Sequence, residues 1–445
     1  MKKERIGDML SKIQNFFRKN VPVKPITLFF IISICSTGLF FLVLPFLGKH
    51  GLDWIVMENN AHFESADYFL CLLFSLGRNH VYQFGIDACY SPLSYGFFYL
   101  ISKMAYLDDL LKNVDLLSIP YEELINMTTK LLSSPYQLLV FIIYSLTGIL
   151  LYLLAIDELT ISRCQKRLLS VIVIFSVPML FGAVERGNLT LYVAGLVLIA
   201  AKLKDASSPV KREIALVLIA ISAGLKFYPA FMGILYLKEH RFKEAFRLIF
   251  YGVICVFVPF AFFGGWSGMQ QLLSNLSSLA AQSNYAYRIQ FFQGILSTFG
   301  IHGFLNQLLN TAFLCILLIL IMWTKNKTRM MTYLAATLAF YPPNAYRYTL
   351  LFFLLPLFAW LEEESECCTF SNYITAGLFS FIFSIPTIFG LVTRFHLNFN
   401  LYTLSYAEVF IYVAAWLLLA LQMLRDICSF IGCHRAGTVH NHQNR

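Results

Sequence analysis

Lys226 lies in the middle of an otherwise apolar stretch, residues 214–237, with basic residues on both sides of that stretch. A lysine at the centre of a membrane-spanning helix costs roughly 2.5 to 3.5 kcal/mol, so such a charge is typical of a functional site that faces a polar cavity. Pro229 follows closely and disrupts a helix because it lacks an amide proton. The sequence therefore predicts a helix break that carries an ammonium group.

Two arginines stand at similar breaks in the apolar pattern. Arg186 belongs to a Glu-Arg-Gly-Asn turn, and Arg347 follows a proline-containing segment with Asn344 and Tyr346. Arginine at the end of a spanning helix often extends its charged group into the membrane interface. This behaviour alone would explain why an arginine stands at either position. Tyrosines are equally typical of an aromatic belt at the membrane surface. Asn344 and Tyr346 are candidates for the lining of a cavity shared with Lys226.

The elements that hold these residues are predicted to be membrane helices. Hydrophobic residues make up 58% of the 445 positions and charged residues only 13%, which is more apolar surface than a soluble core requires. Apolar segments of about 20 residues recur along the chain. The first is too long for a signal peptide and lacks the small residues of a cleavage site, so we expect it to stay in the protein. The sequence predicts one all-α, polytopic membrane domain over residues 1–445.

The distribution of charge sets the predicted orientation. The formal net charge of +9 could suggest a nucleic-acid partner, but most of the lysines and arginines fall in six clusters. The clusters are residues 2–24, 163–167, 202–212, 238–247, 325–329 and 425–445. All six lie on one side if the chain begins in the cytoplasm, as the positive-inside rule requires. We therefore expect no nucleic acid, a cytoplasmic basic arm at residues 1–24 and a cytoplasmic tail at residues 425–445.

This orientation fits about twelve spans. They are expected near residues 25–47, 135–156, 168–184, 189–203, 214–225, 229–238, 247–264, 303–323, 330–343, 348–361, 372–392 and 406–424. The pair 214–225 and 229–238 is too short for two crossings of a core about 30 Å thick. Because both flanks of the pair are basic, we favour a broken hairpin that turns at Lys226 and returns to the cytoplasm. One continuous helix, which would carry residues 238–247 outside, is the alternative.

The longest region between predicted spans, residues 48–134, falls on the outer side of the membrane in this topology. Its apolar stretches are short or interrupted, which is typical of helices that lie in the membrane interface. Such a loop can form a lid over a cavity that is open to lipid.

Several of these motifs also occur together in a known family. Arg-Gly-Asn at residues 186–188 opens a span, and Ala-Gly-Leu-Lys-Phe-Tyr-Pro at residues 223–229 precedes a short apolar run and a basic turn. In this the chain resembles glycosyltransferase family 87, which contains polyprenol-phosphate-mannose-dependent mannosyltransferases. The family also tends to carry an Asp followed by an aromatic residue and a Tyr-Pro-Pro-Leu element. Residues 67–69 and 90–93 are similar to these elements, with Ser91 in place of the first proline.

The resemblance implies a C-type glycosyltransferase fold and a polyprenyl-phosphate sugar as donor substrate, with no further cofactor. It implies inverting transfer of a monosaccharide, mannose in the first instance, to a lipid or glycan acceptor on the extracytoplasmic face of the bacterial plasma (inner) membrane. Cations fixed at the leaving phosphate stabilise the transition state, where that phosphate gains negative charge. Arg186, Lys226 and Arg347 are the candidates for this role. The residues expected to line the cavity are Tyr90, Asn188, Tyr228, Asn344 and Tyr346.

Such a transfer also requires a general base, a carboxylate that accepts the proton of the attacking hydroxyl. Asp67 is the first candidate and Glu64 the second, which makes residues 48–134 the expected catalytic loop. Further candidates are Asp53, Glu58 and Asp87. With Ser65, Asp67 also precedes an apolar run as helix-capping residues do, so stabilisation of a helix N-terminus is the alternative role for Asp67.

Other functional classes have less support. The sequence has no Gly-rich phosphate loop, and its histidines and ten cysteines show neither metal-site nor disulfide spacing, so we expect no metal. The acidic residues 362–366 are interpreted as a solvated turn. A transporter such as a lipid-linked oligosaccharide flippase would predict a second, paired helix break, which we do not find. An outer-face polysaccharide polymerase or ligase shares the lipid-phosphate chemistry and stays open, as does the oligomeric state.

Overall fold

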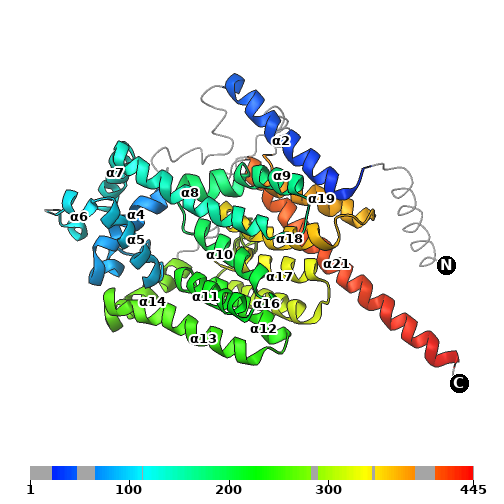
Figure 1. The fold of residues 1–445 in the computed structure, drawn as a ribbon. Coiled ribbons are helices and arrows are strands. Elements are labelled where there is room, and N and C mark those ends of the chain that lie inside the picture. The colour runs from blue at the N-terminus through cyan, green and yellow to red at the C-terminus, as the bar shows by residue number, and fades with distance from the viewer. Residues whose placement is uncertain are drawn as a thin grey trace.

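The computed structural model describes residues 23–47, 66–112, 114–281, 289–342, 346–385 and 406–443. Every secondary-structure element in these ranges is helical (Figure 1). A helix satisfies its own backbone hydrogen bonds in an apolar medium, which explains why so apolar a chain forms helices. The all-α prediction is confirmed.

Five of the described helical segments are long and apolar enough to cross a membrane. They lie within α2 (Pro25–Leu47), α8 (Pro135–Asp157), α13 with η5 (Phe242–Phe257 and Val258–Phe262), α16 (Gly303–Trp323) and α21 (Tyr406–Gln443). A sixth candidate is the pair α9 (Arg163–Ile174) and η3 (Val177–Val184), which is bent by 45°. The bend falls next to Pro178, the second residue of η3, because proline cannot continue the hydrogen-bond ladder of α9. The protein is therefore an integral membrane protein.

The other predicted spans are helices too, but shorter ones. They are α10 (Thr190–Leu203), α11 (Pro209–Leu225), η4 and α12 (Tyr228–Gly233 and Ile234–Lys238), α17 (Lys327–Phe340), η6 and α18 (Arg347–Phe353 and Leu354–Glu363) and α19 (Phe370–Phe383). By length and composition the described residues support five or six spans, so the count of twelve is not confirmed. Nearly every residue of α17 and α18 is buried by other helices. An apolar segment in the centre of a bundle has the hydropathy of a full span without its length.

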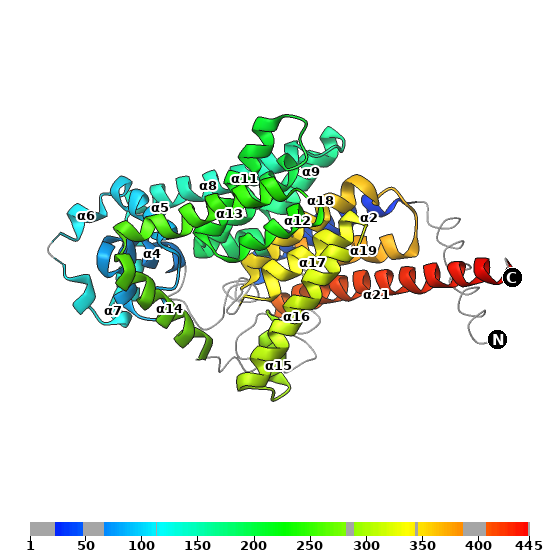
Figure 2. The ribbon, with the colours of Figure 1, turned by 90° about the horizontal axis from the view of Figure 1, so that it is seen from below.

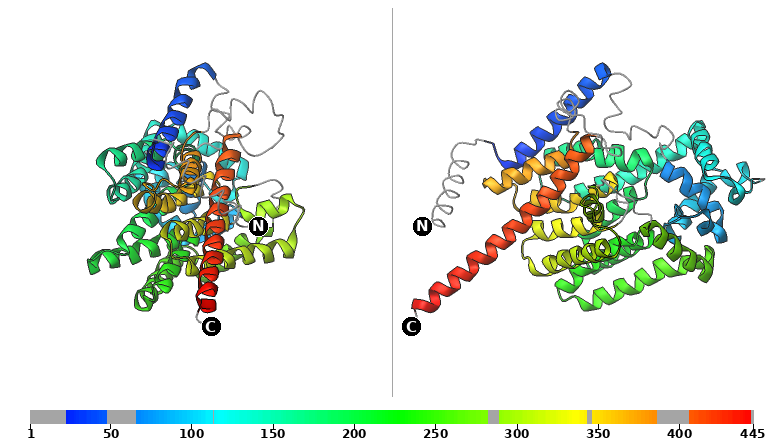
Figure 3. Two further views of the ribbon diagram at one scale, coloured as in Figure 1. Left: turned by 90° about the vertical axis from the view of Figure 1, so that its right-hand side faces the viewer. Right: turned by 180° about the vertical axis from the view of Figure 1, so that it is seen from behind.

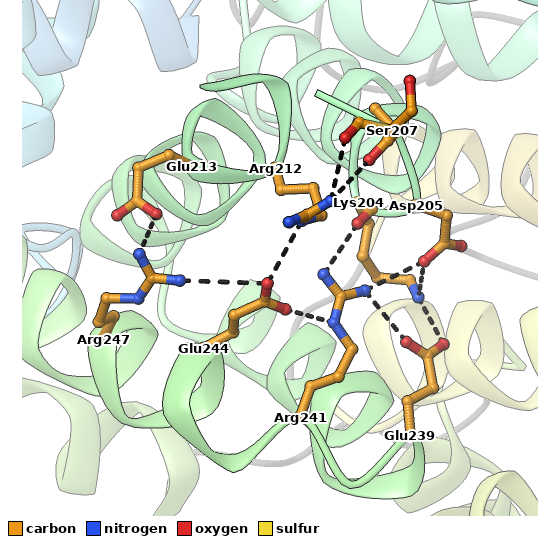
Figure 4. Close-up of polar contacts among 10 residues, drawn as sticks. Lys204, Asp205, Ser207, Arg212, Glu213, Glu239, Arg241, Glu244 and Arg247 are labelled. Carbon is orange, nitrogen blue, oxygen red and sulfur yellow. Dashed lines mark hydrogen bonds and ion pairs between the residues drawn. The ribbon is translucent and has the colours of Figure 1, made fainter. Parts of the chain in front are cut away.

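The chain turns back at the predicted break. Helix α11 ends at Leu225, and Lys226 has an extended backbone, with φ −142° and ψ 131°. Ion pairs then join the start of α11 and the turn before it to the start of α13 and the turn before that helix (Figure 4). Arg212 lies 3.5 Å from Glu244, and Arg241 lies 3.1 Å from Asp205. The segment therefore returns to its own starting side as a broken hairpin, and the continuous-helix alternative is wrong.

Short helices fill the described part of the first loop. They are α4 (Ala66–Leu76), η1 (Arg78–Phe84), α5 (Pro92–Met104), α6 (Leu107–Leu110), η2 (Leu116–Ser118) and α7 (Tyr121–Leu132). Helices α4 to α7 gather at one end of the molecule, with α14 (Gly265–Ala281) beside them (Figures 1 and 2). The remaining helix, α15 (Phe292–Thr298), packs against α16. Helix α21 extends beyond the other helices at the opposite end (Figure 3).

The acidic turn at residues 362–366 is not simply solvated, so that interpretation is wrong. Glu362 accepts from Lys202 at 2.6 Å, Glu364 lies 2.9 Å from Arg425, and Glu363 lies 3.5 Å from Lys327. Glu366 pairs with Lys24. Four of the six basic clusters thus meet at one turn, as expected for clusters that share one side of the membrane.

Candidate active site

Asp67 lies in the first turn of α4, and its carboxylate is held by side chains from the turn between η3 and α10. Arg186 donates from Nε to Oδ2 at 3.0 Å and from Nη2 to Oδ1 at 2.8 Å. Asn188 donates from Nδ2 to Oδ2 at 2.7 Å. The side chains of Asp67 and Arg186 are only 19% and 13% exposed. This bidentate, poorly hydrated pair is of the strong and geometrically specific kind.

Glycine brings that turn onto α4. Gly187 has φ +61°, which favours glycine, and a Cβ at this position would lie 2.5 Å from Cβ of Tyr68. The Tyr144 hydroxyl donates to the Gly187 carbonyl at 3.0 Å and fixes the turn from the other side. Arg186 and Asn188 flank this glycine, so its close approach to α4 places both side chains beside Asp67.

Lys226 is the second charged centre of the site. Its ammonium Nζ donates to Asn188 Oδ1 at 3.0 Å and to Thr190 Oγ1 at 2.9 Å, and the residue is 8% exposed. The rings of Tyr348 and Tyr90 lie 4.9 and 5.1 Å from Nζ, within reach of a cation–π interaction. The ring of Tyr228 lies at 5.9 Å. Asn188 therefore connects the carboxylate of Asp67 to the ammonium of Lys226.

Residues just before and at the start of α5 bond to the helix break that carries Lys226. The hydroxyl of Ser91 donates to the Gly224 carbonyl, and that of Ser94 donates to the Leu225 carbonyl. These carbonyls belong to the last turn of α11, where the break leaves them without helical partners. The Tyr90 hydroxyl accepts from Asn188 Nδ2 at 3.2 Å. Ser91 thus contributes a hydroxyl that a proline at this position could not.

A second arginine–carboxylate pair lies next to the first. Arg347 is buried at the start of η6, and its Nη2 lies 3.4 Å from an oxygen of Glu185. The ring of Tyr346 lies 5.1 Å from the guanidinium carbon of Arg186. Arg186 is therefore linked to Lys226 through Asp67 and Asn188, and the start of η6 places Arg347 beside Glu185 in the turn that carries Arg186.

Eight of the ten predicted site residues meet here. They are Asp67, Tyr90, Arg186, Asn188, Lys226, Tyr228, Tyr346 and Arg347. Glu64 and Asn344 lie outside the described residues, as do Asp53 and Glu58. Three partners were not predicted: Thr190, Glu185 and Tyr348. Each is at most two positions from a predicted residue, so closeness in sequence to a predicted site residue was the signal that could have identified them.

The carboxylate of Asp67 keeps an acceptor position through which it could receive a proton. A carboxylate offers about four acceptor positions, two on each oxygen. Among the described residues, Oδ2 accepts two hydrogen bonds and Oδ1 accepts one. The free position on Oδ1 suits a hydroxyl donor, and the three cations suit an anionic group. Within the ranges given above, no cluster of three or more His, Cys, Asp or Glu residues could hold a metal ion.

Comparison with known proteins gave one match. A family model described as Glycosyltransferase family 87 matches residues 127–352, just over half of the chain. The match includes Arg186, Lys226 and Arg347, whereas Asp67 precedes it. No curated protein and no solved structure matches the chain.

Proposed function

Because the chain belongs to glycosyltransferase family 87, and is therefore a membrane glycosyltransferase, we propose that it transfers a monosaccharide from a polyprenyl-phosphate donor to a hydroxyl of a lipid or glycan acceptor. Mannose is the first sugar to test. The reaction takes place on the extracytoplasmic face of the plasma membrane, since the basic clusters occupy the opposite end of the molecule in this proposal.

The contact between Asp67, Arg186, Asn188 and Lys226 carries the proposal. The acceptor hydroxyl donates to the open position on Asp67 Oδ1 and attacks the anomeric carbon. The new carbon–oxygen bond forms as the bond to the phosphate oxygen breaks, with inversion at that carbon. The hydroxyl proton moves to Asp67, which acts as general base. Arg186 and Asn188 keep the carboxylate in one orientation throughout.

The bonding electrons leave with the polyprenyl phosphate, whose negative charge grows in the transition state. Arg186, Lys226 and Arg347 supply positive charge in a buried setting, where electrostatic interactions are stronger than in water. Their side chains are already ordered by Asp67, Asn188 and Glu185, so little reorganisation is needed when the donor binds.

The test is incubation of the purified full-length protein with polyprenyl-phosphate mannose or polyprenyl-phosphate glucose and a membrane lipid extract, followed by mass analysis of the products. We expect a lipid or glycan that has gained one hexose, with release of polyprenyl phosphate. Transfer from a lipid diphosphate oligosaccharide alone would identify a polymerase or ligase instead. Movement of such a lipid between leaflets without any new covalent product would identify a flippase.

A further inference from the structure

The exposed face of α5 carries two cations that the site around Lys226 does not use. Arg78, the first residue of η1, donates from Nη2 to the Tyr99 hydroxyl, and its guanidinium carbon lies 4.7 Å from the centre of the Tyr99 ring. Lys103, near the end of α5, places its ammonium 5.1 Å from the centre of the same ring. Both distances are within reach of a cation–π interaction. Two positive charges therefore meet at one tyrosine.

Arg78 holds its position in a strained backbone conformation. Its φ is +43°, in the left-handed region that disfavours residues with a Cβ atom. Over the ranges that the structure describes, no carboxylate forms an ion pair with Arg78, and the guanidinium contacts Tyr99 instead. Strain of this kind clusters at functional sites. The charge of Arg78 is thus presented at the surface, where a ligand can reach it.

This face of α5 points away from the site around Lys226. Ser94 is fully buried and bonds to the helix break that carries Lys226. About two and a half helical turns separate Ser94 from Lys103, which puts the two side chains on opposite sides of the helix. Leu100 and Met104, which neighbour Tyr99 and Lys103 in sequence, are 65% and 60% exposed. The cation pair is therefore separate from the proposed donor site and stands among exposed apolar side chains.

Exposed aromatic side chains adjoin the same face. Segment η5 packs on α5, where a Cβ at Gly96 would lie 3.5 Å from the ring of Phe263. Helix α14 packs on η1, and both helices lie at one end of the molecule (Figure 2). At this corner Phe262 and Trp266 are 69% and 71% exposed. Tryptophan, apolar side chains and cations on one surface are typical of protein that lies at the headgroup level of a membrane.

We propose that Arg78 and Lys103 bind the headgroup phosphate of an anionic phospholipid, while Leu100 and Met104 contact its acyl chains. Two neighbouring cations attract an anionic headgroup more strongly than a zwitterionic one, whose ammonium group they repel. The exposed apolar side chains favour a lipid over a soluble phosphate. The contact holds α5 and η1 against the membrane surface, and it does not depend on the proposed function.

A fluorescent reporter next to Tyr99 tests the proposal. Full-length protein with Leu100→Trp is reconstituted in vesicles of phosphatidylglycerol and phosphatidylcholine, and one of the two lipids carries brominated acyl chains. Bromine quenches a tryptophan that it contacts, so exchange of the brominated lipid gives the relative binding constant of the two lipids at this position. The signal of protein without Leu100→Trp is subtracted. We expect a preference for phosphatidylglycerol that falls about fivefold with Arg78→Gly and about fivefold with Lys103→Gln, since each cation near a membrane surface contributes about that factor.

The variants separate the charge from the fold. Glycine suits the φ of Arg78, so Arg78→Gly should not lower the melting temperature, and Lys103→Gln supplies the result if Arg78→Gly does not fold. His240→Gly is the matched control. His240 is exposed with φ +56° in the turn after α12, so this change removes the same strain far from α5 and should leave the lipid preference unchanged.

Three results would overturn the proposal. They are equal binding of the two lipids, a preference that neither Arg78→Gly nor Lys103→Gln lowers, and absence of quenching by either brominated lipid. Loss of the preference in glycerol 3-phosphate, but not in sodium chloride of equal ionic strength, would also overturn it, because the ligand would then be a soluble phosphate.

Discussion

At the scale of single residues, Asn188 is the junction of the site. Its amide nitrogen donates to Asp67 and Tyr90, and its amide oxygen accepts from Lys226, Thr190 Oγ1 and the Thr190 amide. A neutral side chain with both donors and acceptors is suited to this place, because it contacts a carboxylate on one side and an ammonium on the other. Asp67, which we propose as the base, and the buried ammonium of Lys226 are thereby held by one side chain.

Asp67→Asn should reduce transfer by about 10²- to 10⁴-fold, the contribution typical of a positioned general base. The amide keeps an oxygen for Arg186 but cannot accept a proton, so donor binding should change little. Product formation and donor binding are measured side by side, with thermal unfolding as a control because Arg186 loses its counter-charge. Full transfer activity in Asp67→Asn would remove this residue as the base.

Lys226→Met should weaken donor binding by about tenfold or more while leaving the protein folded. Methionine fills the space of the lysine stem, and Asn188 Oδ1 keeps two bonds from Thr190, at 2.9 and 2.7 Å. Thr190 Oγ1, the other acceptor of Lys226, keeps its contact with the Tyr228 hydroxyl at 3.3 Å, so neither acceptor is left unpaired. Lys238→Met is the matched control. Lys238 lies at the end of the hairpin far from the break, and it donates to the main-chain carbonyls of Ile321 and Thr324. A lowered melting temperature with unchanged donor affinity would assign Lys226 a structural role.

The sequence predicted Lys226 well and its neighbours only in part. An ammonium in an apolar stretch is costly in free energy, so its type and place alone indicated a site. Thr190 and Tyr348 carry no such signal, because a threonine and a tyrosine near the end of an apolar segment are ordinary there. Their roles depend on which segments meet, and apart from their closeness in sequence to Asn188 and Arg347 no local pattern contains that information.

At the scale of elements, ion pairs stabilise the broken hairpin. Lys204, which is 1% exposed, lies 2.7 Å from Asp205 and also pairs with Glu239 (Figure 4). Arg241 contacts both of these carboxylates, Asp205 at 3.1 Å and Glu239 at 3.2 Å. These contacts fix the turn between α10 and α11 to the turn after α12, and thus fix both ends of the hairpin whose break carries Lys226.

Glu239→Ala should lower the melting temperature and raise the donor KM together. It leaves the buried ammonium of Lys204 with Asp205 alone, a loss we expect to be about 1 to 3 kcal/mol because Glu239 itself is partly hydrated. Glu213→Ala is the comparison, since Glu213 pairs with Arg247 between more exposed side chains and should lose less. Equal effects of the two variants would show that the burial of Lys204 is irrelevant to the hairpin.

Predictions from sequence were good for the positions of the elements and poor for their extent. Over the residues that the structure describes, each expected span consists mainly of helix, because apolar periodicity reports burial. It does not report whether lipid or protein covers the segment, and α17 and α18 are covered by protein. The hairpin was predictable because the basic residues on both of its flanks constrain both ends of the chain segment.

At the scale of the whole molecule, the charged groups divide between two ends with different uses. The acidic turn at residues 362–366 binds Lys24, Lys202, Lys327 and Arg425, which belong to four separate segments. Near it, Arg329 pairs with Asp426, which joins α17 to α21. The end that contains Asp67 and Lys226 uses charge in a compact site instead. We infer that the first end faces the cytoplasm and holds the bundle together, whereas the second performs the chemistry.

This orientation predicts which thiols an impermeant reagent can reach. Cys367 is exposed beside the acidic turn, and Glu123 is exposed on α7 at the opposite end. In intact cells, an impermeant maleimide should label a variant whose only cysteine is Glu123→Cys and should spare one that retains only Cys367. Permeabilised cells should label both, which controls for reactivity. The reverse pattern would put the basic clusters outside, against the positive-inside rule, and would move the proposed site to the cytoplasmic face. Because the donor must reach Lys226 from the side on which Glu123→Cys is labelled, the same experiment decides which leaflet supplies the sugar.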